Sequence, residues 1–148
     1  MTEFRTITPH LTVREAKAAI EFYKAAFGAI EKYIMPSPED DKIMHAELEI
    51  GNSEIYLNDE FPNCGSQSPI ALNGSPITIH LQVDDADTWF ARAVSAGATV
   101  IMPLEDMFWG DRYGKLVDPF GHHWSIASHI EEVPPEEIMQ RATVQLSS

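Results

Sequence analysis

Short stretches that are apolar or alternate between apolar and polar residues recur along the chain, and such stretches predict strands with a buried face. They lie at residues 6–13, 30–35, 42–50, 54–58, 77–83, 99–102, 113–117 and 123–127. Two other segments, 14–27 and the stretch that starts at Asp84 or Asp85, carry apolar residues at helical spacing. Each is followed by a glycine, Gly28 or Gly97, where a helix end favours a left-handed residue.

The order of these predicted elements occurs twice. In each half a strand ends at a valine, Val13 or Val83, a helix ends at a glycine, and three further strands follow. Each first strand also carries a histidine three residues before that valine, His10 or His80. Internal repetition of this kind indicates a fold built from two like units. We therefore predict an α+β fold of two tandem βαβββ modules.

The predicted modules lie in a single domain that spans residues 1–148. The first module covers residues 5–58 and the second covers residues 76–130. Residues 59–75 form a loop rich in Pro, Asn, Gly and Ser. Because loops of this length are uncommon inside a compact unit, we expect this one to connect the two modules. Residues 131–148 form a tail, in which a short helix begins at a Pro-Pro-Glu-Glu segment.

A hairpin over residues 108–126 closes the second module. Its turn has the sequence Asp-Pro-Phe-Gly at 118–121, where Pro presets the second position and Gly tolerates positive φ at the fourth. The preceding loop presents Trp109, next to Gly110, and Arg112, between Gly110 and Gly114. Either this loop lies over a ligand, or it is a solvated rim in which Arg112 pairs with Asp111.

Charge and cysteine content exclude several classes of function. The 148 residues carry a net charge of -13, and no basic cluster offsets it. Nucleic acids and anionic membrane surfaces need basic patches, so we expect neither as a partner. The single cysteine, Cys64, excludes an internal disulfide, and no apolar run reaches the roughly 18 residues of a membrane span. We therefore expect a soluble cytoplasmic protein.

Alternation also predicts which side chains share the face of the strands that is turned away from the helices. If Leu11, Val13, Leu48, Leu57, Ile79 and Leu81 pack under the helices, the opposite face is polar. It would carry Thr8, His10, Thr12, His45, Glu47, Tyr56, Asn58, Thr78, His80, Gln82, His123 and Ser125. A face that meets only solvent would have a similar composition. The strand histidines and the nearby Trp109 loop favour a ligand cavity.

Four segments resemble the vicinal oxygen chelate superfamily of glyoxalase I, fosfomycin and bleomycin resistance proteins and extradiol dioxygenases, most of all its PhnB-like subgroup. They are 18–29 (AAIEFYKAAFGA), 42–48 (KIMHAEL), 108–114 (FWGDRYG) and 118–124 (DPFGHHW). The resemblance covers about residues 5 to 130. It implies one glyoxalase-like domain whose modules form an open curled barrel, with helices on the convex face and ligands on the concave face. It also implies a homodimer.

Catalytic members of this superfamily bind a divalent metal through four strand positions, usually occupied by His or Glu. Matched strand by strand, these positions hold Thr8, Tyr56, Thr78 and Ser125, none of them a usual ligand. A shift of two residues would substitute His10, Asn58, His80 and either His123 or Ala127. We predict no metal ligands and no firm cofactor. A divalent metal held by His10, His80 and Glu47 is the alternative.

The predicted site combines acid-base and ligand-binding groups. We assign Glu47, with His45 beside it, as the catalytic candidate, because a carboxylate on a half-buried face can act as a base. Arg112 would bind a ligand carboxylate or phosphonate through its planar fork, and Trp109 would stack on the ligand. The other predicted ligand-binding residues are His10, Tyr56, Asn58, His80, Gln82 and Ser125. The alternatives are a solvated Glu47 carboxylate and an Arg112 that pairs with Asp111 or a neighbouring acid.

Three functions follow from the resemblance and these residues. The first is a small-molecule binding protein of the glyoxalase/bleomycin resistance type, in which an acidic cleft would suit a cationic ligand. The second is a lyase, isomerase or dioxygenase that uses a metal or acid-base residues. The third is an enzyme of phosphonate or quinone metabolism, which the PhnB-like likeness implies. We favour small-molecule binding in the concave sheet cavity, and whether the protein is an enzyme stays open.

Overall fold

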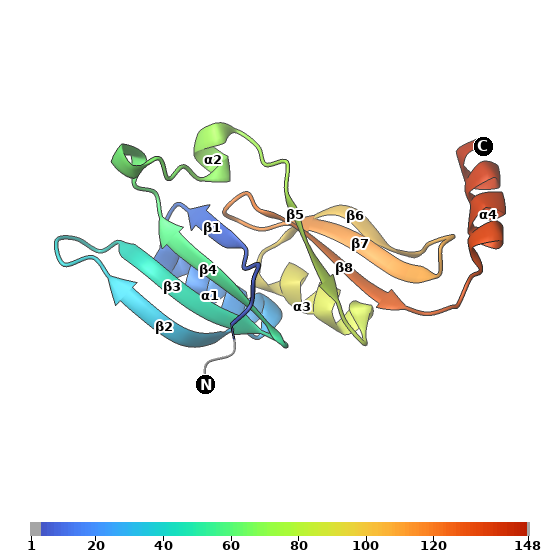
Figure 1. The fold of residues 1–148 in the computed structure, drawn as a ribbon, viewed down its shortest axis with the longest axis horizontal. Helices are drawn as coiled ribbons and strands as arrows, with labels where there is room; N and C mark the ends of the chain where they lie inside the picture. Colours follow the sequence, from blue (N-terminus) through green and yellow to red (C-terminus); the bar gives the residue numbers. More distant parts are fainter. Residues whose placement is uncertain (1–3, 148) are drawn as a thin grey trace.

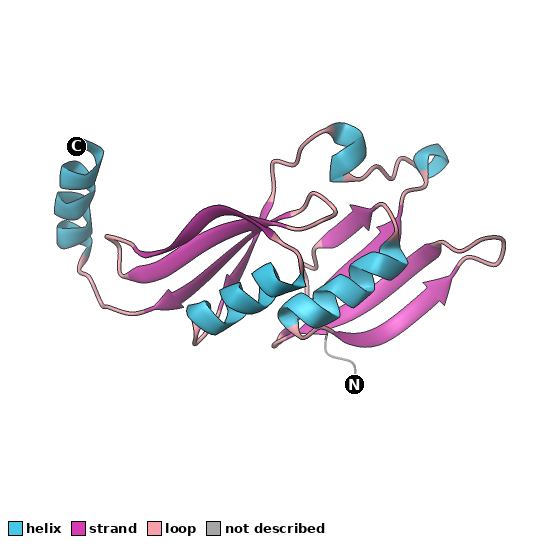
Figure 2. Cartoon of the chain, turned by 180° about the vertical axis from the view of Figure 1, so that it is seen from behind, coloured by secondary structure: helices cyan, strands magenta, loops and turns pink. Residues whose placement is uncertain are grey.

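Two four-stranded sheets, one from each half of the sequence, form the body of the protein. The computed structural model describes residues 4–147. Figure 1 shows the sheets side by side along the long axis of the molecule. Figure 2, seen from behind, shows the long helix of each module on the same side of both sheets, apart from the C-terminal helix. The opposite side of each sheet is not covered by these helices.

Sheet 1 belongs to the first module and has the strand order β1-β4-β3-β2. Its strands are β1 (His10–Val13), β2 (Ile30–Pro36), β3 (Ile43–Ile50) and β4 (Ser53–Asp59), and α1 (Ala16–Phe27) connects β1 to β2. β1 runs parallel to β4, whereas β3 is antiparallel to both of its neighbours.

Sheet 2 repeats this arrangement with the order β5-β8-β7-β6. Its strands are β5 (Thr78–Gln82), β6 (Thr99–Asp106), β7 (Asp111–Val117) and β8 (His123–His129), and α3 (Ala86–Ala96) connects β5 to β6. Again the first strand runs parallel to the last, and the other pairs are antiparallel. The prediction of an α+β fold with two βαβββ modules is therefore confirmed.

The ends of some elements differ from the prediction. β1 starts at His10 rather than at residue 6, because Pro9 has no amide hydrogen; its carbonyl accepts the Tyr56 amide (2.9 Å) just before the ladder begins. β6 extends to Asp106, where it still pairs with β7. The connecting loop contains two unpredicted short helices, η1 (Pro62–Cys64) and α2 (Pro69–Leu72). The tail helix, α4 (Pro135–Ser147), stands beyond the end of sheet 2 (Figure 1).

Each long helix is fixed at its start by the last strand of its own module. The amide of Ala16 donates to Asp59 Oδ1 (2.9 Å), and the amide of Ala86 donates to Ser128 Oγ (2.6 Å). Asp85 caps α3 as well, through its own side chain. Since the first amides of a helix lack partners within it, these bonds satisfy groups that would otherwise be unpaired.

The helices end as their glycines predict. Gly28 has φ 67° and Gly97 has φ 126°, and the amide of each donates back to a carbonyl of its helix. These are conformations that residues with a Cβ atom rarely adopt. No helix in the described part of the chain is both long enough and apolar enough to cross a membrane.

The core lies between the helices and the sheets and continues from one module to the other. Leu48, Leu57 and Trp124 are fully buried. The ring of Phe27 in α1 lies 4.5 Å from the ring of Trp124 in β8, between centroids. Across the same boundary the imidazole of His122 donates to the Thr12 carbonyl (2.9 Å). The modules are therefore joined mainly on their helical side.

A buried carboxylate, Asp118, stands at the centre of this junction. It is 4% exposed and begins the turn between β7 and β8. Its Oδ2 accepts hydrogen bonds from the Tyr23 hydroxyl of α1 and from Trp124 Nε1 (2.8 Å). Its Oδ1 accepts the amides of Phe120 (2.9 Å) and His122 (3.0 Å). These donors satisfy the charge, which would otherwise be costly to bury.

We expect Asp118→Asn to lower the free energy of unfolding by about 2–4 kcal/mol, because the new amide would place its own donor against the donors that now surround the carboxylate. Urea unfolding followed by circular dichroism measures the change. Asp41→Asn is the matched control, since Asp41 is fully exposed, and should change the free energy by less than about 0.5 kcal/mol. Equal stability of Asp118→Asn and the unchanged protein would contradict the assigned role.

Candidate functional site

The uncovered faces of the two sheets carry most of the predicted site residues. We call them open face 1 and open face 2. Open face 1 belongs to sheet 1 and carries His10, Tyr33, His45, Glu47 and Tyr56; open face 2 belongs to sheet 2 and carries His80, Gln82, Tyr113, Lys115 and Ser125. Strand alternation produces this division, because the intervening residues, such as Ala46 and Leu48, are fully buried on the helical side.

Open face 1 combines a hydrogen-bonded His45–Glu47 pair with a cluster of rings. His45 Nε2 lies 2.9 Å from Glu47 Oε2, and their side chains are 22% and 31% exposed. The rings of His45 and Tyr56 meet edge to face at 4.9 Å, and His10 lies 5.6 Å from His45 and 5.8 Å from Tyr56. Tyr33 approaches His45 at 6.3 Å. This arrangement offers a base, a proton donor and an aromatic surface.

Open face 2 has a hydrogen-bonded histidine and a second group of rings. His80 Nδ1 lies 2.7 Å from Ser125 Oγ, and His80 Nε2 lies 2.8 Å from Gln82 Oε1. The ring of His80 stacks on Tyr113 with 6.1 Å between centroids. Trp109 meets Tyr113 edge to face at 5.8 Å. Its Nε1 donates to an oxygen of Asp111, so Trp109 lies at the edge of this face.

The strand register determines which side chains are neighbours across each face. On open face 1 it places His10 beside Tyr56, Tyr56 beside Glu47, and Glu47 beside Tyr33. On open face 2 the corresponding order is His80, Ser125, Lys115 and Met102. Tyr33, Tyr113 and Lys115 were missing from the predicted site. Extending the alternation rule to β2 and β7 would have placed all three on the open faces.

Two predicted residues are engaged elsewhere. Asn58 is 6% exposed, and its amide donates to the carbonyl of Asp59 (2.6 Å). Arg112 pairs with Asp87 of α3 (3.0 Å) and with Asp106 of β6 (3.0 Å), not with Asp111. The bond to Asp87 joins β7 to α3, which covers the side of sheet 2 opposite to open face 2. Neither residue joins the ring clusters of the open faces.

The donor set of the open faces does not fit a divalent metal. The positions that the register pairs across β1–β4 and β5–β8 are His10 with Tyr56 and His80 with Ser125. Tyr and Ser hydroxyls are not usual ligands, and both nitrogens of His80 are already bonded. Among the described residues no three His, Cys, Asp or Glu side chains are grouped to hold a metal ion. His10 and His80, moreover, belong to different sheets.

A cleft of about 730 Å³ lies between the modules. Residues 50–55 of the β3–β4 hairpin line one side, residues 79–84 line the other, and Ile7, Trp89 and Trp124 contribute apolar surface. His80 and Gln82 border this cleft, but none of the open face 1 residues does. Within one chain, therefore, the two open faces do not share this cleft.

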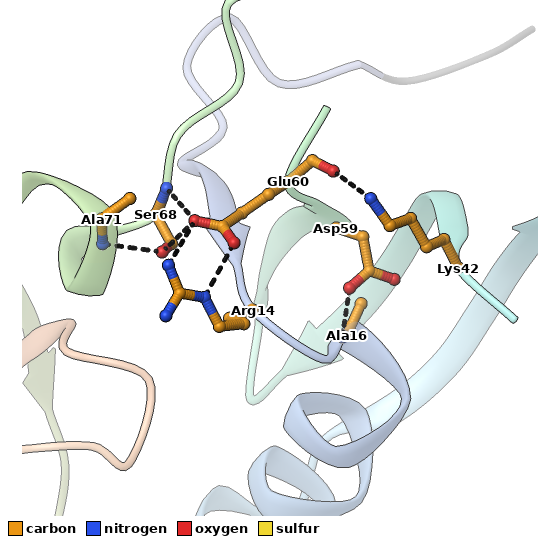
Figure 3. Close-up of polar contacts among 7 residues, drawn as sticks. All are labelled: Arg14, Ala16, Lys42, Asp59, Glu60, Ser68 and Ala71. Carbon is orange, nitrogen blue, oxygen red and sulfur yellow. Dashed lines mark hydrogen bonds and ion pairs between the residues drawn. The ribbon is translucent and has the colours of Figure 1, made fainter. Parts of the chain in front are cut away.

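A second cavity, of about 400 Å³, lies at the start of α1. Figure 3 shows its polar contacts: Glu60 accepts from Arg14 Nε (2.9 Å) and from the Ser68 hydroxyl (2.6 Å). The Glu60 carbonyl accepts from Lys42 (2.9 Å). The bonds from Arg14 and then Ser68 lower the pKa of Glu60 to about 2. Because these charged groups satisfy one another, we assign this cluster a structural role that anchors the connecting loop.

The lowered pKa of Glu60 predicts a pH dependence of stability. The unfolded carboxyl titrates near pH 4.5, so its contribution is complete above that pH and is lost as pH falls toward about 2. We expect the stabilisation to be on the order of 1 kcal/mol, since half-exposed Arg14 lets water screen the pair. Urea unfolding at pH 3 and at pH 7 should differ less for Glu60→Gln than for the unchanged protein. Glu39→Gln, an exposed control, should keep the original difference.

Comparison with known proteins matches residues 5–126 to the model of the Glyoxalase/Bleomycin resistance protein/Dioxygenase superfamily. An uncharacterized protein of Mycobacterium bovis is 49% identical over 142 residues, which make up 94% of this chain and 93% of that protein. A solved gene product of Arabidopsis thaliana has 32% identity and a TM-score of 0.67, covering 84% of this chain and 99% of its own.

A PhnB protein from Bacillus cereus is also similar in structure, with a TM-score of 0.66. The match covers 84% of this chain and 99% of that protein, at 19% identity. At this identity the similarity shows a shared fold alone.

Proposed function

The chain belongs to the glyoxalase/bleomycin resistance protein/dioxygenase superfamily, and from this premise we propose that it binds a small organic molecule against its open sheet faces. The observation that carries the proposal is the ring cluster of open face 1, where His10, His45 and Tyr56 meet within 5.8 Å. A comparable cluster on open face 2 supports it. Small-molecule sites are lined by aromatic groups with a few well-placed polar ones, and both faces have that composition.

The alternative, a face that merely meets water, explains these clusters less well. A strand face that meets only solvent has no need of rings packed edge to face. The His45 and Glu47 side chains are also each less than one-third exposed, whereas a pair on a purely solvated face would be exposed and would contribute little to stability. Rings in this arrangement stabilise each other by about 0.5–1.5 kcal/mol and leave flat surfaces for a further ring. The ligand we propose is therefore planar, with an aromatic or conjugated part.

We propose that a second copy of the chain completes the site. In a single chain neither long helix covers the open faces, and large side chains on or beside them are exposed, among them Tyr33 (49%), Met35 (38%) and Met102 (39%). Exposed large apolar side chains on a sheet face are typical of an interface. β1 and β5 also lie at the edges of their sheets, each with a single neighbouring strand in the described residues. A homodimer would bring open faces of two copies around one ligand.

The His45–Glu47 pair favours a second candidate function, an acid-base lyase or isomerase. Glu47 would take a proton from a carbon next to a carbonyl, and its neighbour Tyr56 would protonate the oxygen. This function differs from binding alone in that a bound molecule would be converted.

We expect the neutral probe naphthalene-2-carboxamide to bind with micromolar to millimolar affinity, as a fragment of its size would. Isothermal titration calorimetry measures the dissociation constant. Tyr56→Ala and Tyr113→Ala should each weaken binding by about fivefold, because each removes a ring contact of about 1 kcal/mol. Leu72→Ala, which removes an exposed apolar side chain from α2, is the control and should bind normally. Unchanged affinity in both tyrosine variants would contradict the proposed site.

For the dimer, we expect sedimentation at micromolar concentration to give a particle of two chains of 16.6 kDa each. Met102→Asp should shift the equilibrium toward single chains, because it places a charge on the exposed apolar surface of the proposed interface. The same change should leave the circular dichroism spectrum as it is, since Met102 is not part of the buried core. A monomer at every concentration would refute the proposed pairing.

A further inference from the structure

Lys115 is a basic side chain that has no partner among the described residues of a strongly acidic chain. The sequence has 10 Lys and Arg residues against 23 Asp and Glu residues. Most other cations of the described residues are bonded to carboxylates or carbonyls; Arg14 bonds Glu60, for example, and Arg112 bonds Asp87. The side chain of Lys115 makes no hydrogen bond, ion pair or cation-π contact with any described residue. An unpaired cation is unusual where carboxylates are so abundant, and its location therefore matters.

The backbone directs Lys115 onto open face 2. Its neighbour Leu116 is fully buried in the core. On its other side Gly114 faces α3, since a Cβ atom there would lie 2.7 Å from Phe90. Residues on either side of Lys115 thus point to the helical side, and Lys115 points to the opposite side. It is half-buried there, beside Ser125 on β8.

The surroundings of Lys115 are aromatic and hydroxylic rather than acidic. Ser125 is its neighbour across the strands, and Tyr113, two residues earlier, stacks with His80 on the same face. The acid that the register places nearest is Glu105, opposite Tyr113 on β6. Glu105 is exposed and forms no ion pair with Lys115. The ammonium group therefore shares its face with the Tyr113 ring and has no neutralising charge among the described residues.

Comparison of the two modules makes this difference plain. On open face 1 the register runs across the strands from His10 to Tyr56 to Glu47. On open face 2 it runs from His80 to Ser125 to Lys115, so Glu47 and Lys115 occupy equivalent positions. The Glu47 carboxylate has a hydrogen-bond partner, because its Oε2 lies 2.9 Å from His45 Nε2. The Lys115 ammonium has none among the described residues. Equivalent positions in the repeated architecture thus carry opposite charges, and of these two only the positive one lacks a described partner.

We propose that the ligand carries an anionic group, of carboxylate type, that Lys115 binds while Tyr113 contacts the planar part of the same molecule. This inference rests on the proposed function, since it names the chemical class of the molecule that the open faces would hold. When a ligand covers open face 2, it removes Lys115 from water, and the loss of hydration is unfavourable unless an opposite charge comes with it. A carboxylate supplies that charge in a strong ionic hydrogen bond.

The test compares three probes of the same ring size: naphthalene-2-carboxylate, naphthalene-2-carboxamide and 2-naphthylmethylammonium. Calorimetry on the full chain should show the carboxylate binding at least about tenfold more tightly than the amide, the size expected of an ionic hydrogen bond. Lys115→Met should abolish that preference while the amide still binds. Lys115→Glu should favour the ammonium probe, and Lys115→Arg should retain the preference for the carboxylate. Lys17→Met, an exposed lysine of α1, is the control.

The outcomes separate this inference from the proposed function. If carboxylate and amide bind the unchanged protein equally, or if Lys115→Met keeps the preference, the anionic ligand is refuted while small-molecule binding stands. If none of the three probes binds, the proposed function fails together with the inference. Melting curves of the Lys115 variants show whether they are folded. A preference that is lost in folded Lys115→Met and kept in Lys115→Arg supports the assignment.

Discussion

The buried carboxylate of Asp118 is the constraint on which the arrangement of the two modules depends. A charge that is 4% exposed requires donors, and they come from both halves of the chain: Tyr23 from α1, and Trp124 with two amides from the β7–β8 hairpin. Moving one module relative to the other would separate Tyr23 from Asp118. Because an uncompensated buried charge is strongly unfavourable, the hydrogen bonds help to keep α1 against the second module.

This junction determines which surfaces are available for function. Since the modules are joined through their helices, the helical sides of both sheets are covered and the other sides remain open (Figure 2). Each open face then takes its character from every second residue of its strands. The repeated architecture keeps His10 and His80 in equivalent places, whereas the side chains around them differ. One fold thus presents two surfaces of related geometry and different chemistry, to which a single asymmetric ligand could be complementary.

Family membership and site chemistry give different information about this protein. The superfamily match and the structural neighbours establish the fold, but a fold is compatible with many reactions. The side chains are more specific. His80 has both ring nitrogens engaged, and the hydroxyls of Tyr56 and Ser125 stand next to the first-strand histidines. Such groups suit hydrogen bonding and stacking better than metal ligation, which is why we place binding ahead of metal-dependent catalysis.

Local sequence determined the elements of the fold. Alternation and the glycines at 28 and 97 predicted the strands and helix ends, and the repeat predicted two like modules. These features depend on residues that are close in the sequence, so they can be predicted without knowledge of tertiary contacts. The same alternation rule placed His45 and Glu47 on one face, and in the structure they are hydrogen-bonded to each other.

Tertiary structure decided what depends on distant residues. It directed Arg112 to Asp87 of α3, buried Asn58, and put His10 and His80 on separate sheets. It also made Asp118 a junction rather than only a turn residue, because Tyr23 approaches it from 95 positions away. Sequence patterns fix the side of a strand on which a residue lies. How the two sheets are placed relative to each other depends on long-range packing, and no local pattern contains it.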